Sequence, residues 1–230
     1  MIKIGNLDTY SSIPESVITI GKFGVLHKGH EEILKSIKNV KLYPIVFSFT
    51  PSPALFFSKD HKLHGKIFTS RQMNNILGNY FNGNYLYFLQ KFNNYFSSIT
   101  PEVFIQLLCE RFNMKHLIVG SDFTFGVNKT GNISIINSLA VKYKFDISII
   151  DNKNNISTTL LRNFLQQGKV KEFNNLTAFS EKFKIVGTVV RGMEIAGKIL
   201  GYKTANILLT KNQILPLFGV YSVNIKIDNK

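Results

Sequence analysis

Residues 17–30 read VITIGKFGVLHKGH, a β-branched run followed by a glycine-containing loop and the start of a helical pattern. The run over residues 17–20 is typical of a buried strand that enters a loop at Gly21. The apolar spacing that follows marks one face of a helix over residues 30–39. Unpaired N–H groups and a partial positive charge make a helix N-terminus attractive to phosphates. This stretch therefore predicts a strand–loop–helix unit with an anion site at the helix start.

Two histidines stand at that predicted helix start. His27 and His30 are three residues apart, so both can face one anion, and Gly29 between them lets a phosphate approach the backbone. Two imidazoles can donate hydrogen bonds to a phosphoryl oxygen as charge builds in a transition state. The alternative is a pair of surface histidines at a helix cap, but the preceding strand and glycines favour the anion site. His61 and His64 have the same spacing without a preceding strand, and we expect solvated loop residues there.

Strand-like and helix-like segments alternate outward from this stretch. Strands are predicted over residues 44–49, 117–119 and 147–150. Helices are predicted from Thr69 to Leu77, from Thr100 and Pro101 onward as a capped start, and over residues 160–167, ended by Gly168. Such alternation predicts an α/β domain with a mostly parallel sheet.

The pattern changes after Glu181. Residues 183–190 are strand-like, residues 221–227 alternate apolar and polar side chains with period two, and glycines recur between them. We therefore expect two units, residues 1–182 and residues 183–230, the second being the opening of an all-β unit near the size at which a lone domain is marginal.

The composition excludes several classes of protein. The 230 residues are 44% hydrophobic and 13% aromatic, unlike a disordered chain. The single cysteine, Cys109, excludes an intramolecular disulfide and is expected as a small core residue. No signal peptide and no apolar run of membrane-spanning length is visible. A cytoplasmic protein without a membrane partner is the expectation.

The charge is strongly positive, with 28 Lys+Arg against 14 Asp+Glu and a net charge of +14. Nucleic-acid binding, polyphosphate substrates and simple compositional drift each explain such a charge. No recognition helix, zinc finger or arginine cluster is visible, which ranks nucleic acid last. Only Arg162 and Lys28 fall within the motifs expected to touch phosphate.

Two further loops carry polar groups. Residues 119–126, VGSDFTFG, place Asp122 after a strand end, as in ligand loops at the carboxyl edge of a parallel sheet. A polar loop with two packed aromatic rings explains that segment equally well. Residues 156–162, ISTTLLR, place three hydroxyls and Arg162 at a helix start. The hydroxyls can cap the helix or hold phosphate oxygens, and Arg162 can reach the same anion.

Taken in order, these segments resemble the bacterial FAD synthetases, the bifunctional riboflavin kinase/FMN adenylyltransferase family. TIGKFGVLHKGH is similar to the family's nucleotide-binding signature with its His-x-Gly-His, and SFTPSP to the segment that carries Pro-His-Pro. VGSDFTFG and ISTTLLR resemble two further adenylyltransferase motifs. Residues 197–206, GKILGYKTAN, and the later LPLFGVY resemble the start of the riboflavin kinase domain.

The resemblance implies a Rossmann-like nucleotidyltransferase domain followed by a β-barrel kinase domain, which is incomplete here. It implies transfer of AMP from ATP to FMN, giving FAD and pyrophosphate, with Mg²⁺ shared among the phosphates. Small molecules are the expected partners, and the oligomeric state stays open.

By position in the family's motifs, three residues would act on the ATP phosphates: His27, His30 and Arg162. Eight more would bind nucleotide or flavin: Gly21, Phe23, Gly29, Asp122, Ser157 and Thr158, with Thr204 and Asn206 matching metal and nucleotide ligands of the kinase.

Departures from the family's pattern set the remaining alternatives. Gly24 stands where the family has an Asp, Ser52 replaces the histidine of Pro-His-Pro, and Lys203 replaces a proline. The kinase's catalytic glutamate would lie beyond Lys230, so we expect adenylyltransferase activity without kinase activity. The alternatives are a degenerate member that binds ATP or flavin without turnover, a bifunctional enzyme whose remaining part is missing here, or a related nucleotidyltransferase.

Overall fold

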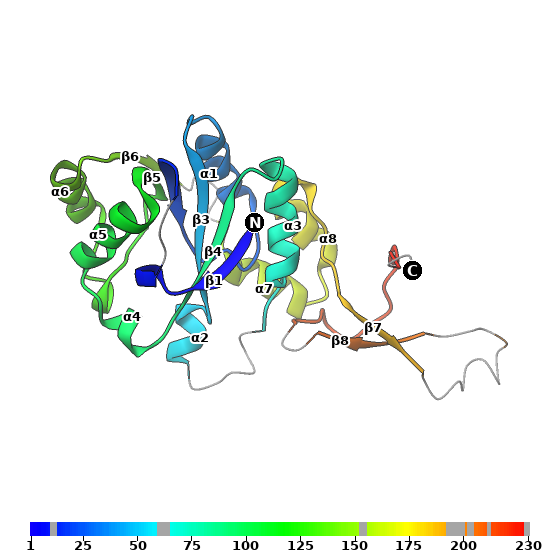
Figure 1. Ribbon diagram of the computed structural model, residues 1–230. Coiled ribbons are helices and arrows are strands. Elements are labelled where there is room, and N and C mark those ends of the chain that lie inside the picture. Colours follow the sequence, from blue (N-terminus) through cyan, green and yellow to red (C-terminus); the bar gives the residue numbers. More distant parts are fainter. Residues whose placement is uncertain are drawn as a thin grey trace.

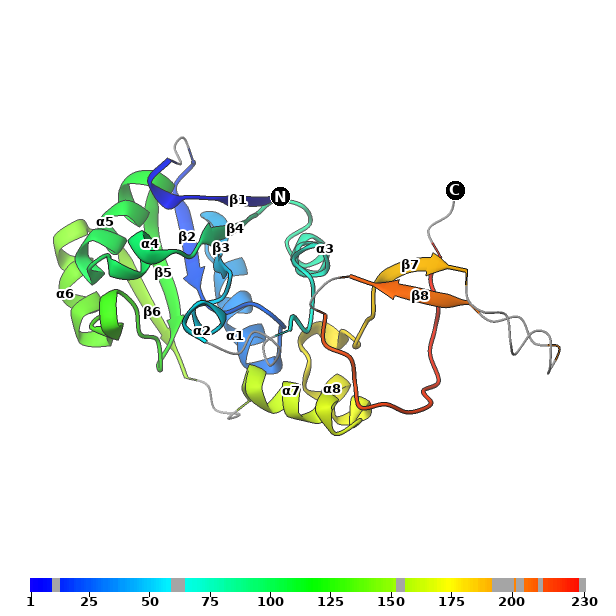
Figure 2. The same cartoon turned by 90° about the horizontal axis from the view of Figure 1, so that it is seen from below.

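A computed structural model describes residues 1–9, 13–58, 65–151, 156–191, 201, 205–210 and 213–227. A six-stranded, fully parallel sheet forms the centre of the molecule, and helices cover both of its faces (Figure 1). A separate pair of antiparallel strands lies to one side of this body in both views (Figures 1 and 2). The predicted Rossmann-like α/β fold is confirmed.

The sheet has the strand order β1-β4-β3-β2-β5-β6. Apart from the added edge strand β1, this is the 3-2-1-4-5 order of doubly wound folds. The central strand β2 is buried along its whole length, as expected of a strand covered by helices on both faces. The strands are β1 (Ile2–Gly5), β2 (Ser16–Ile20), β3 (Tyr43–Thr50), β4 (Leu86–Lys91), β5 (Met114–Gly120) and β6 (Asp146–Ile150).

The described helices differ in length and in the face of the sheet that they cover (Figure 1). They are α1 (Lys28–Lys38), α2 (Pro53–Phe57), α3 (Ser70–Tyr80), α4 (Asn94–Ser98), α5 (Pro101–Phe112), α6 (Ile133–Tyr143), α7 (Thr158–Gln166) and α8 (Val170–Leu176), with short 3-10 turns at Leu7–Thr9, Val127–Lys129 and Ala178–Ser180.

Alternate strand residues point into two separate cores. Val17 and Val46 pack against α1, α3, α7 and α8 on one face of the sheet. Ile18 and Phe47 pack against α4, α5 and α6 on the other face. Both cores are continuous from edge to centre, so the sheet holds the ends of its strands in a fixed array.

The predicted helix starts at Thr69 and Thr100 are confirmed. The Thr69 hydroxyl accepts from the backbone N–H of Gln72 at 3.2 Å, and that of Thr100 accepts from Val103 at 3.3 Å. Gly168 follows α7 with a φ of +73°, the conformation that a helix-ending glycine supplies. Helices α1 and α7 both begin two residues before the predicted starts, because a polar first turn precedes the apolar spacing.

The second unit forms only a short hairpin in the described residues, made of β7 (Gly187–Val190) and β8 (Asn206–Leu209). The strand predicted over residues 221–227 is wrong: those residues belong to no strand and are exposed, Val223 at 68% and Ile225 at 74%. Period-two spacing favours extended backbone, but a strand also needs a partner for its N–H and C=O groups. In the described residues none lies beside this segment.

Three remaining expectations concern single features. Cys109 is partly buried against the core that contains α5, and burial raises the pKa of its thiol to about 11. His61 and His64 lie outside the described residues. Within the part of the chain that the structure describes, no helix is long and apolar enough to span a bilayer.

Candidate active site

The site lies where the strand order of the sheet reverses, between β2 and β5. Strand β2 pairs with β3 on one side and with β5 on the other. The loops that leave the carboxyl ends of β2 and β5 therefore diverge to opposite faces and leave a crevice between them. In open α/β sheets this switch point is where ligands bind.

The loop from β2 to α1 is held firmly against neighbouring strands. The Gly21 N–H donates to the Phe47 carbonyl at 3.1 Å, and the Phe23 N–H donates to the buried Ser48 hydroxyl at 3.3 Å. The Phe23 ring is buried and approaches Gly21 so closely that a Cβ there would lie 3.1 Å from it. The loop is thus a rigid entry to the first turn of α1.

The two histidines of that turn face each other. Their rings stack with centroids 3.8 Å apart at 26°, and the His27 N–H donates to His30 Nδ1 at 3.5 Å. The Phe23 ring lies 5.1 Å from the ring of His30. His27 caps α1 and is only 5% exposed, and its Nδ1 is buried without a hydrogen-bond partner among the described residues.

Burial sets the charge of this pair. It lowers the pKa of His27 to about 4. The pKa of His30 falls to about 3, chiefly through burial and further through the neighbouring His27, while a hydrogen bond with the Val25 backbone raises it in part. Both rings are therefore neutral at pH 7, and each carries one N–H donor. Neutral donors at a helix N-terminus can bind a phosphate without the cost of burying two imidazolium charges.

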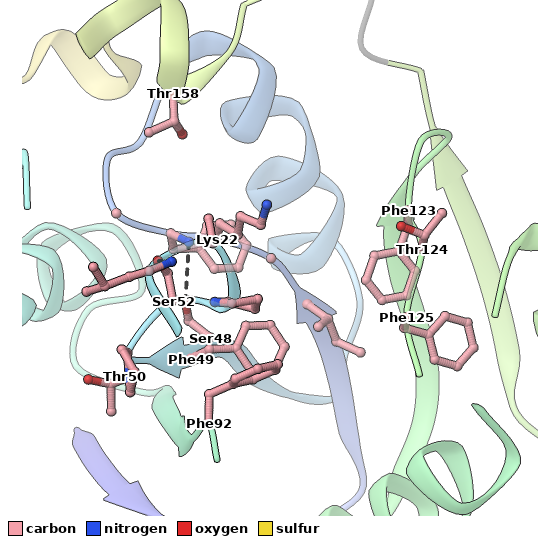
Figure 3. A pocket seen from close by; sticks show the side chains of 18 of the residues that line it. Lys22, Ser48, Phe49, Thr50, Ser52, Phe92, Phe123, Thr124, Phe125 and Thr158 are labelled. Carbon is pink, nitrogen blue, oxygen red and sulfur yellow. Dashed lines mark hydrogen bonds between the residues drawn. The ribbon is translucent and has the colours of Figure 1, made fainter. Parts of the chain in front are cut away.

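A cleft of about 1670 Å³ opens beside the pair. It exceeds the 300–1,000 Å³ usual for one small ligand, so it has room for two. Its lining comes from segments far apart in the sequence, among them the β2–α1 loop, residues 48–55 from the end of β3 to the start of α2, residues 65–68, residues 122–129 after β5, and residues 156–159 at the start of α7. Figure 3 shows Thr158 on one side of the cleft and Phe49 with Phe92 on the other.

The described lining of the cleft is positively charged. It contains one carboxylate, that of Asp122, and four basic side chains, those of Lys22, Lys66, Lys129 and Arg162. Lys28 is exposed and is not part of the lining. This balance suits an anionic ligand.

The start of α7 contributes hydroxyls and a guanidinium. The Ser157 hydroxyl accepts from the Leu160 N–H at 3.2 Å, so it caps the helix. The Thr158 side chain belongs to the cleft lining. Arg162 donates from Nη1 to the Gly65 carbonyl at 2.9 Å, and burial lowers the pKa of its guanidinium, which stays charged.

Most of the predicted site residues meet in this cleft. Those that line it are Gly21, Phe23, His27, Gly29, His30, Asp122, Ser157, Thr158 and Arg162. Asn206 does not: it is exposed on β8, in the separate hairpin. Thr204 lies outside the described residues.

The profile of the FAD synthetase family matches residues 10–160, more than half of the chain. The chain belongs to the FAD synthetase family. A riboflavin kinase profile matches residues 179–230. The family resemblance expected from the motifs is thereby confirmed, and with it a nucleotidyltransferase whose family uses ATP and FMN as substrates.

Relatives of this FAD synthetase extend the same match. The bifunctional riboflavin kinase/FMN adenylyltransferase of Buchnera aphidicola subsp. Acyrthosiphon pisum is 34% identical over 228 residues, covering 92% of this chain and 68% of the relative. The Escherichia coli K12 protein of the same name is 29% identical over 233 residues, covering 96% and 72%. A crystal structure described as a macrolide-efflux protein from Streptococcus pneumoniae has a TM-score of 0.83 at 26% identity, covering 96% of this chain and 73% of that one.

Two of the three departures from the family pattern, Gly24 and Ser52, lie at this cleft, and the third, Lys203, lies outside the described residues. Gly24 is exposed, and a Cβ built on it meets nothing within 4 Å, so the site has space for the family's aspartate. Ser52 caps α2, its hydroxyl accepting from the Leu55 N–H at 3.4 Å.

Sequence reasoning missed several lining residues of this FAD synthetase. Ser48 lies inside an apolar run, and only its hydroxyl distinguished it. Lys22 and Lys66 are two of many scattered lysines, so nothing in the sequence marked them. Sequence reasoning expected the packed rings of Phe123 and Phe125, which stack at 5.3 Å, but missed Phe92, which packs edge-on against Phe49 at 5.8 Å. These four rings form an aromatic wall of the cleft (Figure 3).

Proposed function

We propose that this chain joins FMN to the AMP part of ATP within the cleft. An oxygen of the FMN 5′-phosphate attacks the α-phosphorus of ATP, and a new P–O bond forms. The bond from the α-phosphorus to the oxygen bridging toward the β-phosphorus breaks, and pyrophosphate leaves with that electron pair. The attacking phosphate is already an anion, so no protein nucleophile is needed, and catalysis rests on positioning and charge stabilisation.

The stacked, neutral pair of His27 and His30 at the N-terminus of α1 carries this proposal. Their N–H groups and the backbone amides at the start of α1 are the donors we assign to the phosphates nearest the reacting centre. Arg162, on the wall that α7 contributes, would hold the rest of the triphosphate. Ser157 and Thr158 would complete that wall, and Gly29 would allow close approach of a phosphate.

Mg²⁺ enters in this proposal with ATP, as the Mg-ATP substrate. The described residues contain no cluster of three His, Cys, Asp or Glu side chains that could hold a metal. Asp122 is the single carboxylate in the described lining of the cleft. Such a lining fits an ion held mainly by phosphate oxygens, which would neutralise charge on the departing pyrophosphate.

The aromatic wall is the part of the cleft that we assign to the flavin ring. The rings around Phe49, Phe92 and Phe123 offer flat apolar surfaces opposite the phosphate-binding groups. Offset or edge-on packing against such rings stabilises a flat heterocycle. FMN would thus lie with its ring on the aromatic wall and its phosphate toward His27.

The direct test measures FAD formed from FMN and Mg-ATP by chromatography, with wild type beside His30→Ala. Removal of a transition-state phosphate contact is expected to lower kcat about 100-fold or more. His116→Gln is the matched control, because His116 lies on β5 outside the cleft and bonds Ser148 at 2.9 Å. Unchanged turnover in His30→Ala would remove His30 from the mechanism.

A member that binds without turnover is the second candidate, favoured by the loss of the family's groups at Gly24 and Ser52. It predicts quenching of FMN fluorescence on binding with no release of pyrophosphate. Measured on the same protein, those two quantities separate binding from catalysis.

We further infer two units, residues 1–182 and 183–230, and no riboflavin phosphorylation by a polypeptide of these 230 residues. The inference is supported by exposure: in the described part of the second unit Phe218 is 97% exposed and Ile225 74%. A flavin site needs such side chains gathered into an enclosed pocket. FMN formed from riboflavin and ATP by the 230-residue chain would contradict this inference.

A further inference from the structure

We propose that residues 213–217, which belong to the riboflavin-kinase-like unit, are a positioning strap for Arg162 in the adenylyl-transfer cleft. The proposal rests on the role of Arg162 proposed above. It assigns to the second unit a part in the reaction of the first, through backbone contacts rather than through a shared ligand.

The strap joins the two pieces of chain between which Arg162 lies. Gln213 pairs with Lys66 as a parallel β-bridge, and the Ile214 N–H donates to the Lys66 carbonyl at 2.9 Å. Three residues later the Leu217 N–H donates to the Leu165 carbonyl, again at 2.9 Å. The strap thereby spans from residue 66 to α7 in a few residues and fixes their separation.

Arg162 occupies that span. It lies one turn before Leu165 on α7, and its Nη1 donates to the carbonyl of Gly65, the residue just before Lys66. Each partner in the Arg162–Gly65 hydrogen bond therefore lies close in the sequence to a residue that bonds the strap: Gly65 is next to Lys66, and Arg162 is one helical turn from Leu165. An arginine side chain loses rotamer entropy when it is held in place, so a fixed distance between helix and acceptor favours one orientation of the guanidinium.

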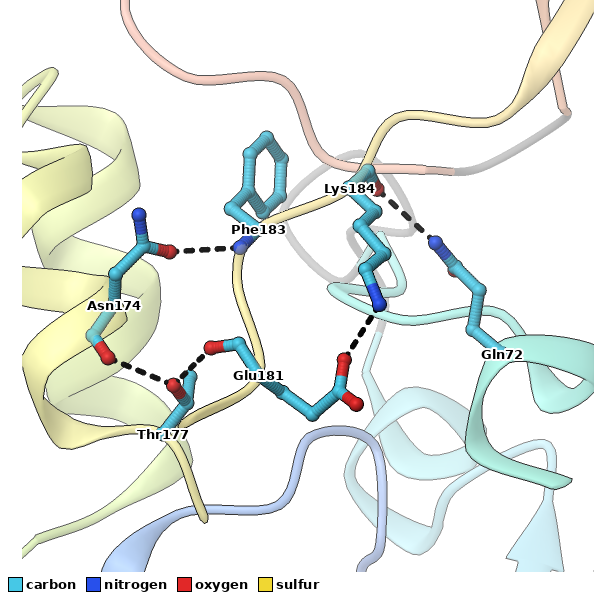
Figure 4. Close-up of polar contacts among 6 residues, drawn as sticks. All are labelled: Gln72, Asn174, Thr177, Glu181, Phe183 and Lys184. Carbon is cyan, nitrogen blue, oxygen red and sulfur yellow. Dashed lines mark hydrogen bonds and ion pairs between the residues drawn. The ribbon is translucent and has the colours of Figure 1, made fainter. Parts of the chain in front are cut away.

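The strap is itself anchored to residues 183–186 at the start of the second unit, called the linker below. The Gln213 side chain donates to the Lys184 carbonyl at 2.7 Å and accepts from the Val186 N–H at 3.1 Å. The linker also contacts the first unit, because the Gln72 side chain of α3 donates to the Lys184 carbonyl at 3.1 Å (Figure 4).

The linker has a further anchor on α8. The Phe183 N–H donates to Asn174 Oδ1 at 2.7 Å (Figure 4). Ile214 also packs against the core that contains α1, α3 and α7. Backbone hydrogen bonds, side-chain hydrogen bonds and a core contact therefore all fix the position of the strap.

The test is a double-mutant cycle between Ile214→Pro and Arg162→Gln, measured as the Kd and KM for Mg-ATP. Proline at 214 removes the N–H that bonds Lys66. We expect Ile214→Pro to raise the KM for Mg-ATP about tenfold in the wild-type background and less than twofold in the Arg162→Gln background, because the strap acts through Arg162. An equal factor in both backgrounds, or no change in either, would overturn the proposal.

A proline at Ile225 is the matched control, since that residue lies in the same unit, is 74% exposed and belongs to no strand. It should leave the KM for Mg-ATP unchanged. If Ile214→Pro does not fold, as judged by circular dichroism, Gln213→Ala takes its place in the cycle. Gln213→Ala removes the side-chain anchor while keeping every backbone N–H, and about a threefold effect that disappears with Arg162→Gln is expected.

Hydrogen–deuterium exchange separates this proposal from the proposed function. Ile214→Pro, or Gln213→Ala in its place, should speed exchange in residues 65–68 and 160–166, and Ile225→Pro should not. This readout needs no turnover, so it still applies if the wild type makes no FAD and the proposed function fails. Unchanged exchange in both segments would overturn the strap whatever the activity.

Discussion

The histidine pair shows how a single turn of helix can be prepared for phosphate. His27 and His30 are stacked, poorly solvated and neutral, so the site offers N–H donors without holding two like charges together. In water such donors gain little from a phosphate, but partial burial strengthens the interaction. The sequence predicted both residues because the strand, the glycines and the helix start surround them. It could not predict their charge state, which depends on packing from distant segments.

The same burial makes stability depend on pH. The pKa of His27 is about 4 in the folded chain against an ordinary value of 6.5, so below pH 6.5 the unfolded chain takes up a proton that the folded chain does not. The contribution of neutral His27 is complete above pH 6.5 and is lost progressively as the pH falls toward 4. At pH 5.5 the loss is about 1 kcal/mol for this histidine.

Urea unfolding between pH 7.5 and pH 5 measures this effect. The free energy of unfolding of wild type should fall more steeply toward acid than that of His27→Gln, which has no imidazole to protonate at position 27 and keeps only the contribution of His30. Parallel pH curves for the two proteins would show that His27 titrates normally in the folded state.

At Gly24 a variant can restore a group that the family has, instead of removing one. It has an ordinary backbone conformation, and a Cβ there meets nothing within 4 Å, so Gly24→Asp should change the free energy of unfolding by less than about 0.5 kcal/mol. If the missing aspartate slows this enzyme, the variant should raise kcat/KM for FAD formation about tenfold. Gly24→Ala supplies the control without the carboxylate. Activity equal to that control would mean that the loss at position 24 is neutral.

At the level of elements, prediction succeeded where a local signal marked both ends of a segment. The caps at Thr69 and Thr100 and the glycine after α7 are such signals, and the structure places those helices accordingly. Strand β4 and helix α6 were missed: β4 follows the turn residues Asn82 and Gly83, but its unbroken apolar run shows no period that separates a strand from a helix, and α6 is apolar on too many faces to show one stripe. Residues 221–227 had the pattern of a strand but no pairing partner in the described residues, which periodicity does not reveal.

The N-terminus of α7 separates capping from ligand binding. Ser157 caps the helix, so Ser157→Ala should lower the free energy of unfolding by about 1 kcal/mol, and Ser157→Asn should restore most of it. Thr158 lines the cleft without a cap bond of its own, so Thr158→Val should raise the KM for ATP severalfold with little loss of stability. Thermal unfolding and steady-state kinetics on the three variants distinguish the roles. A KM effect confined to Ser157→Ala would reverse the assignment.

At the scale of the whole molecule, the site exists only because the sheet order brings segments that are distant in the sequence to one edge. The glycine-rich loop, the loop after β5 and the start of α7 were predicted as polar segments, and their convergence follows from the switch point between β2 and β5. Lys22 and Lys66 join them for the same topological reason. One sequence alone cannot tell these lysines from the other basic residues of a chain with a net charge of +14.

The salt dependence of the KM for ATP shows whether the basic residues of the cleft or the net charge of the chain attracts the substrate. If the four basic residues of the cleft attract ATP, raising the ionic strength from about 0.05 M to about 0.5 M should raise the KM for ATP about fivefold, because screening shortens the reach of those charges. Lys22→Gln should raise the KM at low salt and flatten the salt dependence. Lys41→Gln, an exposed lysine outside the cleft, removes the same formal charge and should change neither. If both variants behave alike, the net charge of the molecule rather than the lining of the cleft draws the substrate in.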